Sequence, residues 1–173
     1  MSELLPHEIG FLERAVSRGE TENTQASIDM TSAIDDPNSW HDNAAYDEVI
    51  GRMTLIDARY APVLRILREA EVIEYPDMDE EAVAIGSLVN IELNTDPLWL
   101  VLVGQSQEGV EDYQRQWRTI SEDELFVITS SSPLGSAVLH RKTGETSSYT
   151  INGQQMSLKV KSIDQKWIKA FAR

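Results

Sequence analysis

The sequence predicts an α+β protein in which an N-terminal antiparallel coiled-coil hairpin precedes a C-terminal antiparallel β-sheet domain with one short helix. Two observations carry this prediction. Between residues 4 and 75, apolar side chains recur every three or four positions, which is the spacing of helices with one apolar seam. Beyond residue 81 the pattern changes to short runs of Val, Ile, Leu, Tyr and Thr bounded by turn residues, which is typical of strands.

The helical half, residues 1–75, consists of two arms joined by a turn. The first seam comprises Ile9, Leu12, Val16, Gly19, Asn23, Ala26, Met30 and Ala33. The second seam comprises Val49, Met53, Ile56, Tyr60, Val63, Leu67 and Ala70. The segment between the arms is rich in Asp, Asn, Ser and Pro, so an acidic tip is expected near 35–43. Pro62 is expected to kink the second helix because it lacks the N–H that continues the hydrogen-bond ladder.

The second half, residues 82–173, is expected to form the sheet domain, with 76–81 as a polar, Pro-containing linker. Strands are expected at 83–93, 98–103, 125–129, 147–151 and 156–163. Asn152-Gly153 lies between two alternating runs and is a strong signal for a tight β-hairpin.

The remaining parts of this half are expected to be short. A helix at 136–141 is expected to pack across the sheet, and the polar stretch 104–124 reads as a long loop. The tail, 164–173, contains aromatic and basic residues and is expected to form a short amphipathic helix on the sheet domain.

Charge and composition exclude several classes of protein. Lys and Arg number 15 against 29 Asp and Glu, giving a net charge of −14, so autonomous binding to DNA or RNA phosphates is not expected. The absence of cysteine excludes a disulfide framework, Cys-based zinc sites and thiol catalysis. The sequence lacks a signal-peptide pattern, and no apolar run approaches the roughly 18 residues that span a bilayer. We therefore expect a cytoplasmic protein that does not associate with membranes.

Three segments, in the same order along the chain, resemble the GreA/GreB transcript-cleavage factors. Residues 41–46 (His-Asp-Asn-Ala-Ala-Tyr) are similar to the tip of that family, and residues 68–73 (Arg-Glu-Ala-Glu-Val-Ile) to the end of its second helix. Residues 132–139 (Ser-Pro-Leu-Gly-Ser-Ala-Val-Leu), followed by 143–145 (Thr-Gly-Glu), resemble its Ser-Pro-Leu-Gly loop, apolar helix and acidic turn.

This resemblance implies an FKBP-like sheet domain and bacterial RNA polymerase as the partner. In such factors the sheet domain docks at the mouth of the polymerase secondary channel, and the coiled coil reaches toward the active site. The residues that match the docking loop are Ser132, Pro133, Leu134 and Gly135. The residues that match tip contacts are Ser39, Trp40, His41 and Asn43. A factor of this kind acts through the polymerase active site and is not itself an enzyme.

The tip departs from the pattern of cleavage-active Gre factors, which carry two acidic residues three positions apart. Asp42 matches the second acid and is the candidate catalytic carboxylate, whereas Ser39 replaces the first. Asp42 and Asp36 are the candidate ligands shared with the polymerase Mg²⁺; no cofactor is expected on the chain alone. Asp42 also fits the N-cap of the second helix, and the two roles are compatible. Cleavage of backtracked RNA and modulation without cleavage therefore both stay open.

Two other functions are weighed against this one. A coiled-coil adaptor with an unrelated protein partner predicts no affinity for polymerase. An FKBP-type prolyl isomerase requires a concave, aromatic-lined pocket, which the sequence pattern does not specify. Indirect contact with nascent RNA is compatible with the Gre-like role, although the first arm carries basic residues only at Arg14 and Arg18.

Overall fold

A computed structural model of the chain describes residues 3–34, 44–77, 81–104 and 108–171. The chain forms two compact units. Unit 1 comprises Met1–Gly10 and Glu69–Arg173, and unit 2 comprises Phe11–Arg68. None of the described helices combines the length and apolar character that crossing a membrane requires.

The first ten residues belong with the sheet unit, which differs from the division 1–75, 76–81 and 82–173 expected from the sequence. The reason is a short parallel pairing between β1 (Glu3–Leu4) and β2 (Glu71–Val72). Leu4 and Leu5 are also almost fully buried, so this N-terminal segment contributes to the apolar core of unit 1.

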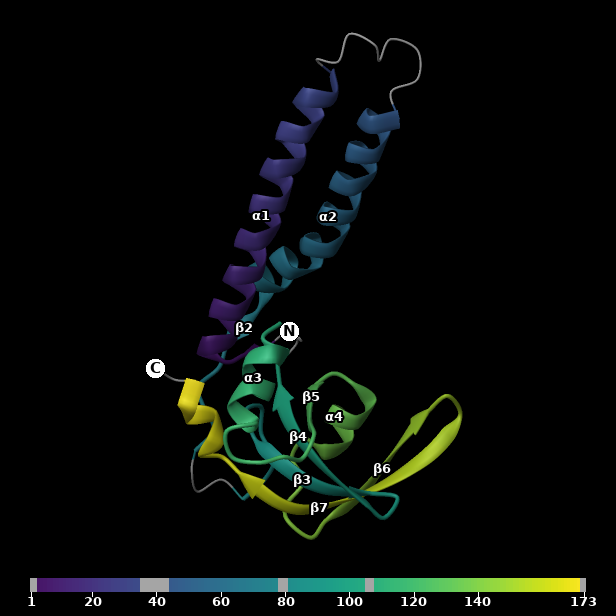
Figure 1. Cartoon of the computed structure of the whole chain (residues 1–173). Coiled ribbons are helices and arrows are strands. Elements are labelled where there is room, and N and C mark those ends of the chain that lie inside the picture. The colour runs from purple at the N-terminus through teal and green to yellow at the C-terminus, as the bar shows by residue number, and fades with distance from the viewer. Residues whose placement is uncertain (1–2, 35–43, 78–80, 105–107, 172–173) are drawn as a thin grey trace. The chain divides into compact units, whose positions relative to one another are not determined.

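Unit 2 consists of most of the antiparallel hairpin formed by α1 (Pro6–Ile34) and α2 (Ala44–Glu69), which lie side by side in Figure 1. The helices meet along the predicted seams, where a buried cluster and its half-buried neighbours comprise Ala26, Val49, Ile56, Met30, Met53 and Tyr60. Gly19 makes room for the Tyr60 ring, because a Cβ at Gly19 would lie 2.6 Å from two ring carbons. α2 continues through Pro62 and bends toward its C-terminal end (Figure 1).

Unit 1 is built on a five-stranded sheet. Its strands are β3 (Leu88–Leu93), β4 (Asp96–Val103), β5 (Leu125–Thr129), β6 (Thr146–Ile151) and β7 (Gln154–Asp164). The spatial order is β5-β4-β3-β7-β6, and every pair is antiparallel except β4 and β5. The α+β prediction is confirmed. The parallel pair departs from a purely antiparallel sheet because the chain between β4 and β5 makes a crossover.

The two faces of the sheet are covered by different elements. On one face α4 (Pro133–Val138) packs on a buried cluster from β3, β4 and β7 that includes Val89, Leu100 and Leu158. Alternation along β4 points Trp99 to the opposite face, where its ring lies 5.1 Å from that of Trp117. This second face is covered by α3 (Val110–Trp117), and the 3-10 helix η1 (Trp167–Phe171) packs against Tyr113 of α3.

Of the shorter elements expected in unit 1, two differ from the prediction and two are confirmed. The helix expected at 136–141 begins at Pro133 and ends at Val138, because Ser132 caps it and Pro133 suits its first position. The expected loop 104–124 contains α3, whose apolar residues occur at helical spacing. The Asn152-Gly153 turn is confirmed, with φ angles of 50° and 78°. The tail helix is confirmed as η1, which packs on unit 1.

Candidate functional sites

The predicted tip lies outside the described residues. Asp36, Ser39, Trp40, His41, Asp42 and Asn43 all fall between Ile34, where α1 ends, and Ala44, where α2 begins. Their roles therefore stay predictions. Within the described ranges, no group of three or more His, Asp or Glu side chains is arranged to hold a metal ion.

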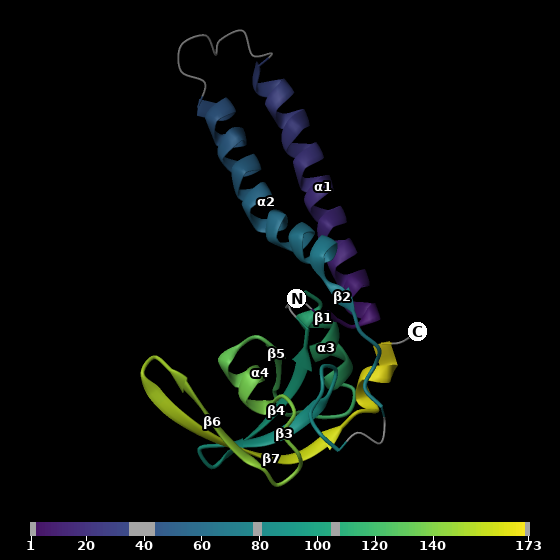
Figure 2. The same ribbon diagram turned by 180° about the vertical axis from the view of Figure 1, so that it is seen from behind.

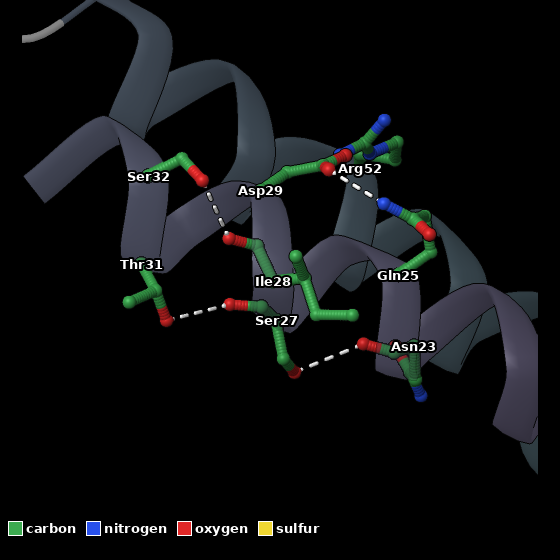
Figure 3. Close-up of polar contacts among 8 residues, drawn as sticks. All are labelled: Asn23, Gln25, Ser27, Ile28, Asp29, Thr31, Ser32 and Arg52. Atoms are coloured by element: carbon green, nitrogen blue, oxygen red, sulfur yellow. Dashed lines mark hydrogen bonds and ion pairs between the residues drawn. The ribbon is translucent and has the colours of Figure 1, made fainter.

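Asp29, the acidic residue drawn in Figure 3, is hydrogen-bonded to neighbouring side chains. Gln25 donates to the Asp29 carboxylate at 2.8 Å, and Arg52 of α2 donates to its other oxygen (Figure 3). These two hydrogen bonds lower the pKa of Asp29. The Asp29–Arg52 pair thus links the two helices and is not available as an extra carboxylate for the tip.

The outward face of α1 near the tip is almost uncharged. The hydroxyls of Ser27, Thr31 and Ser32 each donate to the carbonyl four residues earlier, at 2.9–3.2 Å (Figure 3). Ile28 lies among them and is 55% exposed. This face offers no cation to a phosphate, which agrees with the scarcity of basic residues in the first arm.

The Ser-Pro-Leu-Gly segment forms the start of α4. Ser132 Oγ accepts from the backbone N–H of Gly135 at 3.1 Å and donates to the Thr129 carbonyl at 2.8 Å. Ser136 Oγ donates to the Ser130 carbonyl at 3.0 Å. These bonds fasten the first turn of α4 to the end of β5, so the segment has a definite conformation within unit 1.

Each of the four residues has a distinct environment. Pro133 is exposed, whereas Leu134 is half-buried and packs against the core cluster under α4. Gly135 is buried, and a Cβ there would lie 2.0 Å from the Thr129 carbonyl oxygen. Ser132 and Gly135 therefore have structural roles, and Leu134 is partly buried against the core. Pro133 is the member that is free to contact a partner.

A buried polar cluster that was not predicted from the sequence lies at the start of α1. Glu8 is 2% exposed, and its carboxylate accepts from the backbone N–H of Leu5 at 2.6 Å and of Gly104 at 3.0 Å. The bond to Leu5 is half of a capping box, with Pro6 at the first helical position. The Leu-Pro-His-Glu order was the local signal for this cap, whereas the bond to Gly104 has no local signal.

His7 lies beside this carboxylate in sequence and is enclosed by aromatic rings. Its ring nitrogens make hydrogen bonds with the hydroxyls of Tyr75 at 3.1 Å and Tyr113 at 2.6 Å. Its ring stacks on Tyr75 and on Phe171 of η1, with centroid distances of 5.6 Å and 5.3 Å. The first turn of α1, α3 and the tail are thereby packed together within unit 1.

Burial shifts both titratable groups away from charge. It raises the pKa of Glu8 to about 7, although the two backbone N–H groups act in the opposite direction. It lowers the pKa of His7 to about 4. Near neutral pH, His7 is therefore a neutral ring that donates to one tyrosine and accepts from the other. The cluster anchors the start of α1.

Unit 1 also has a groove of about 360 Å³ beside β2. It is lined by Glu3, Ile73, Glu74, Tyr75, Pro76, Asp77, Ala84, Ile85, Leu139 and His140. Tyr75 is the one Phe, Tyr or Trp residue among these. Such a lining does not favour the prolyl isomerase alternative, which needs an aromatic-walled pocket.

The chain is similar to curated GreA proteins. Transcription elongation factor GreA of Caldanaerobacter subterraneus subsp. tengcongensis is 27% identical over 124 residues, which cover 70% of this chain and 71% of that protein. Transcription elongation factor GreA of Mycobacteroides abscessus is 32% identical over 111 residues, which cover 62% of this chain. The match spans 61% of the mycobacterial protein, less than two thirds of its length.

The chain is a divergent GreA/GreB-like protein. No family model matches it. Among solved structures, GreA factor homolog 1 (Gfh1) of Thermus thermophilus matches this GreA/GreB-like chain with a TM-score of 0.40 and 18% identity. That match covers 93% of this chain and 97% of the Thermus protein. The GreA/GreB factor of Nitrosomonas europaea matches with a TM-score of 0.34 and 17% identity, covering 61% and 78% of the two chains.

Proposed function

We propose that this GreA/GreB-like chain binds bacterial RNA polymerase in its secondary channel and regulates transcription elongation. The observation that carries the proposal is the sequence similarity to curated proteins named transcription elongation factor GreA. The chain would act in the cytoplasm, through the polymerase active site, and would not be an enzyme by itself. Binding of the chain to purified core polymerase, measured by biolayer interferometry, tests this function directly.

The start of α4 is the proposed docking segment. Its Ser132 cap and its close contact at Gly135 hold Pro133 and Leu134 in a fixed conformation before any partner arrives. A segment that is already ordered loses little conformational entropy on binding. Substitutions at Ser132, Leu134 or Gly135 would disturb unit 1 itself, because these residues are packed or hydrogen-bonded within it.

Pro133→Glu is therefore the sharpest test of docking. Glutamate is compatible with the first turn of a helix, so α4 is expected to persist, while a charge enters the exposed docking position. We expect the Kd for core polymerase to rise at least about tenfold, equivalent to about 1.4 kcal/mol. Thr143→Glu, which adds the same charge at another exposed position, is expected to leave the Kd unchanged. Equal affinities for the Pro133→Glu variant and the parent would exclude this docking segment.

At the tip, Asp42 is the proposed carboxylate that approaches the polymerase active site, with Asp36 as a second candidate. Carboxylate oxygens are ligands that Mg²⁺ accepts, and the metal stabilises the charge that develops on phosphate oxygens during cleavage. Ser39 cannot add the second negative charge found in cleavage-active tips. We therefore propose modulation without cleavage as the main mode, with stimulation of cleavage as the alternative.

Stalled, backtracked elongation complexes distinguish these modes. The chain is titrated at several Mg²⁺ concentrations, and shortening of the RNA is followed with and without a cleavage-active GreA. We expect no faster cleavage by the chain alone and slower cleavage when it competes with GreA. We expect Asp42→Asn to change the catalytic rate of the polymerase without changing its affinity for the chain. Stimulated cleavage would reverse the choice of mode. If the chain neither stimulates cleavage nor competes with GreA, the coiled-coil adaptor with an unrelated protein partner becomes the better function.

A further inference from the structure

β6 is an outer strand of the sheet, and within the described part of the chain it pairs only with β7. β3 ends at Leu93, opposite Leu158 of β7, so the far part of the β6–β7 hairpin continues as a two-stranded ribbon. Both Figure 1 and Figure 2 show this hairpin extending beyond the ends of β3 and β4. A ribbon of two strands is marginally stable in water and gains from a further strand.

The free edge of β6 lacks charge, proline and bulges, three features that usually prevent strands from pairing between molecules, and α4 packs near the strand. From residue 146 to residue 158 the chain has no charged side chain and no proline, and the pairing of β6 with β7 has no bulge. Thr, Tyr and Ile side chains favour the extended conformation, and Ile151 is 47% exposed. The opposite edge strand, β5, directly follows three acidic residues at 122–124. Exposed, uncharged edges of this kind pair with other strands.

The tight turn at Asn152-Gly153 decides which backbone groups of β6 face outward. In a two-residue hairpin the closing pair, here Ile151 and Gln154, exchanges hydrogen bonds between the two strands. Hydrogen-bonded and non-bonded pairs then alternate along the ladder. The backbone N–H and C=O groups of Thr146, Ser148 and Thr150 therefore point away from β7 and toward the free edge.

From this arrangement we propose that β6 is a self-association edge, where a second copy of this chain adds its own β6 in antiparallel orientation. With Ser148 opposite Ser148 of the second copy, Thr146 lies opposite Thr150, and the outward groups of all three residues are paired. Such a register forms about six hydrogen bonds between the copies. The pairing joins two five-stranded sheets into one and converts the two marginal ribbons into a four-stranded one.

Charge favours a second copy at this edge over the acidic parts of the surface. Each chain carries a net charge of −14, so copies repel one another wherever acidic side chains meet. The uncharged run from 146 to 158 is a strip where two copies approach without placing like charges directly opposite each other. Salt screens the remaining repulsion, so self-association is expected to strengthen as the salt concentration rises.

Sedimentation velocity of the full chain over a range of concentrations tests the proposal. One six-residue edge buries less than a standard interface, so we expect a reversible dimer with a Kd of about 10–100 μM. Ser148→Lys places two positive charges opposite each other and is expected to raise that Kd at least about tenfold. Ser157→Lys is the matched control, because Ser157 is exposed and pairs with Ser148 from the inner strand. It is expected to leave the Kd within about twofold.

A cysteine variant tests the register. The chain has no cysteine, so Ser148→Cys introduces a single thiol that faces its counterpart in the dimer. Under a mild oxidant such as diamide, we expect disulfide-linked dimers to form faster for Ser148→Cys than for Ser157→Cys. A chain that stays monomeric up to about 1 mM would overturn the proposal. So would equal weakening by the two lysine variants, or equal cross-linking of the two cysteine variants.

Discussion

Replacing Gly135 with alanine is expected to destabilise unit 1 by about 3 kcal/mol. The new methyl group would lie 2.0 Å from the Thr129 carbonyl oxygen and 3.0 Å from Ser132 Oγ. The first contact involves backbone, which cannot rotate away as a side chain does. α4 must therefore move away from β5, and the two hydrogen bonds of the Ser132 hydroxyl are lost with that movement.

Tryptophan fluorescence during guanidinium unfolding measures this effect, because three of the four tryptophans, Trp99, Trp117 and Trp167, lie in unit 1. Far-UV circular dichroism follows the helical hairpin separately. Ser131→Ala, in the same exposed turn, removes a small group without a steric clash and is expected to change the free energy of unfolding by less than about 0.5 kcal/mol. A Gly135→Ala variant as stable as Ser131→Ala would show that the close approach at Thr129 is not a constraint.

Changing Glu8 to glutamine is expected to make the protein sensitive to mild acid. Glu8 prefers its neutral form in the folded state, because its pKa rises from 4.5 to about 7. Its contribution to stability is therefore complete below pH 4.5 and is lost as the pH rises to 7. His7 behaves in the opposite way, because its pKa falls from 6.5 to about 4 on folding. Its contribution is complete above pH 6.5 and is lost as the pH falls toward 4.

The two contributions nearly cancel between pH 4.5 and 6.5, where each changes by about 3 kcal/mol. In the parent chain this pair of residues therefore adds little to the net pH dependence of the free energy of unfolding. Glu8→Gln removes one contribution and leaves that of His7, so the free energy of unfolding is expected to fall by about 3 kcal/mol from pH 6.5 to 4.5. His7→Phe is expected to show the reverse slope, with stability rising as the pH falls.

Urea unfolding at several pH values, expressed as the difference between each variant and the parent, isolates these slopes. The exposed groups whose pKa values are also lowered, Asp29 and Glu92, are common to all three proteins and cancel in the difference. Parallel pH profiles for the parent and Glu8→Gln would contradict the assignment of a buried, neutral carboxyl group at Glu8.

The parts of the fold that follow from local pattern were predictable from the sequence. The helix seams, the Asn152-Gly153 turn and the short amphipathic tail depend on residues that are close together in the chain, and all three are confirmed. The proposed docking segment was identified through its Ser-Pro-Leu-Gly resemblance, and its conformation depends on a cap that is equally local. The function of this segment stays a proposal.

The missed features depend on distant partners or on weak local signals. α3 was predicted as loop because it is mostly polar, although Val110, Tyr113 and Trp117 have the spacing of one buried helix face. The local sequence predicts that Glu8 is exposed on a helix surface. Its buried environment depends on Gly104, which follows β4 and lies far away in the sequence. The parallel pairing of β4 and β5 depends in turn on α3, so it was missed for the same reason.

The meeting of His7 and Phe171 has a consequence for the synthesis of the protein. A chain emerges from the ribosome in order, at about 5–20 residues per second. The hairpin of unit 2 is made from one continuous stretch, so it can form soon after residue 68 has been added. Unit 1 is interrupted by that hairpin, and His7, which precedes the hairpin, packs against Phe171, which is translated long after it. The packing around His7 therefore cannot be completed until residue 171 has been made, so a segment translated before the hairpin reaches its final environment only after the hairpin can form.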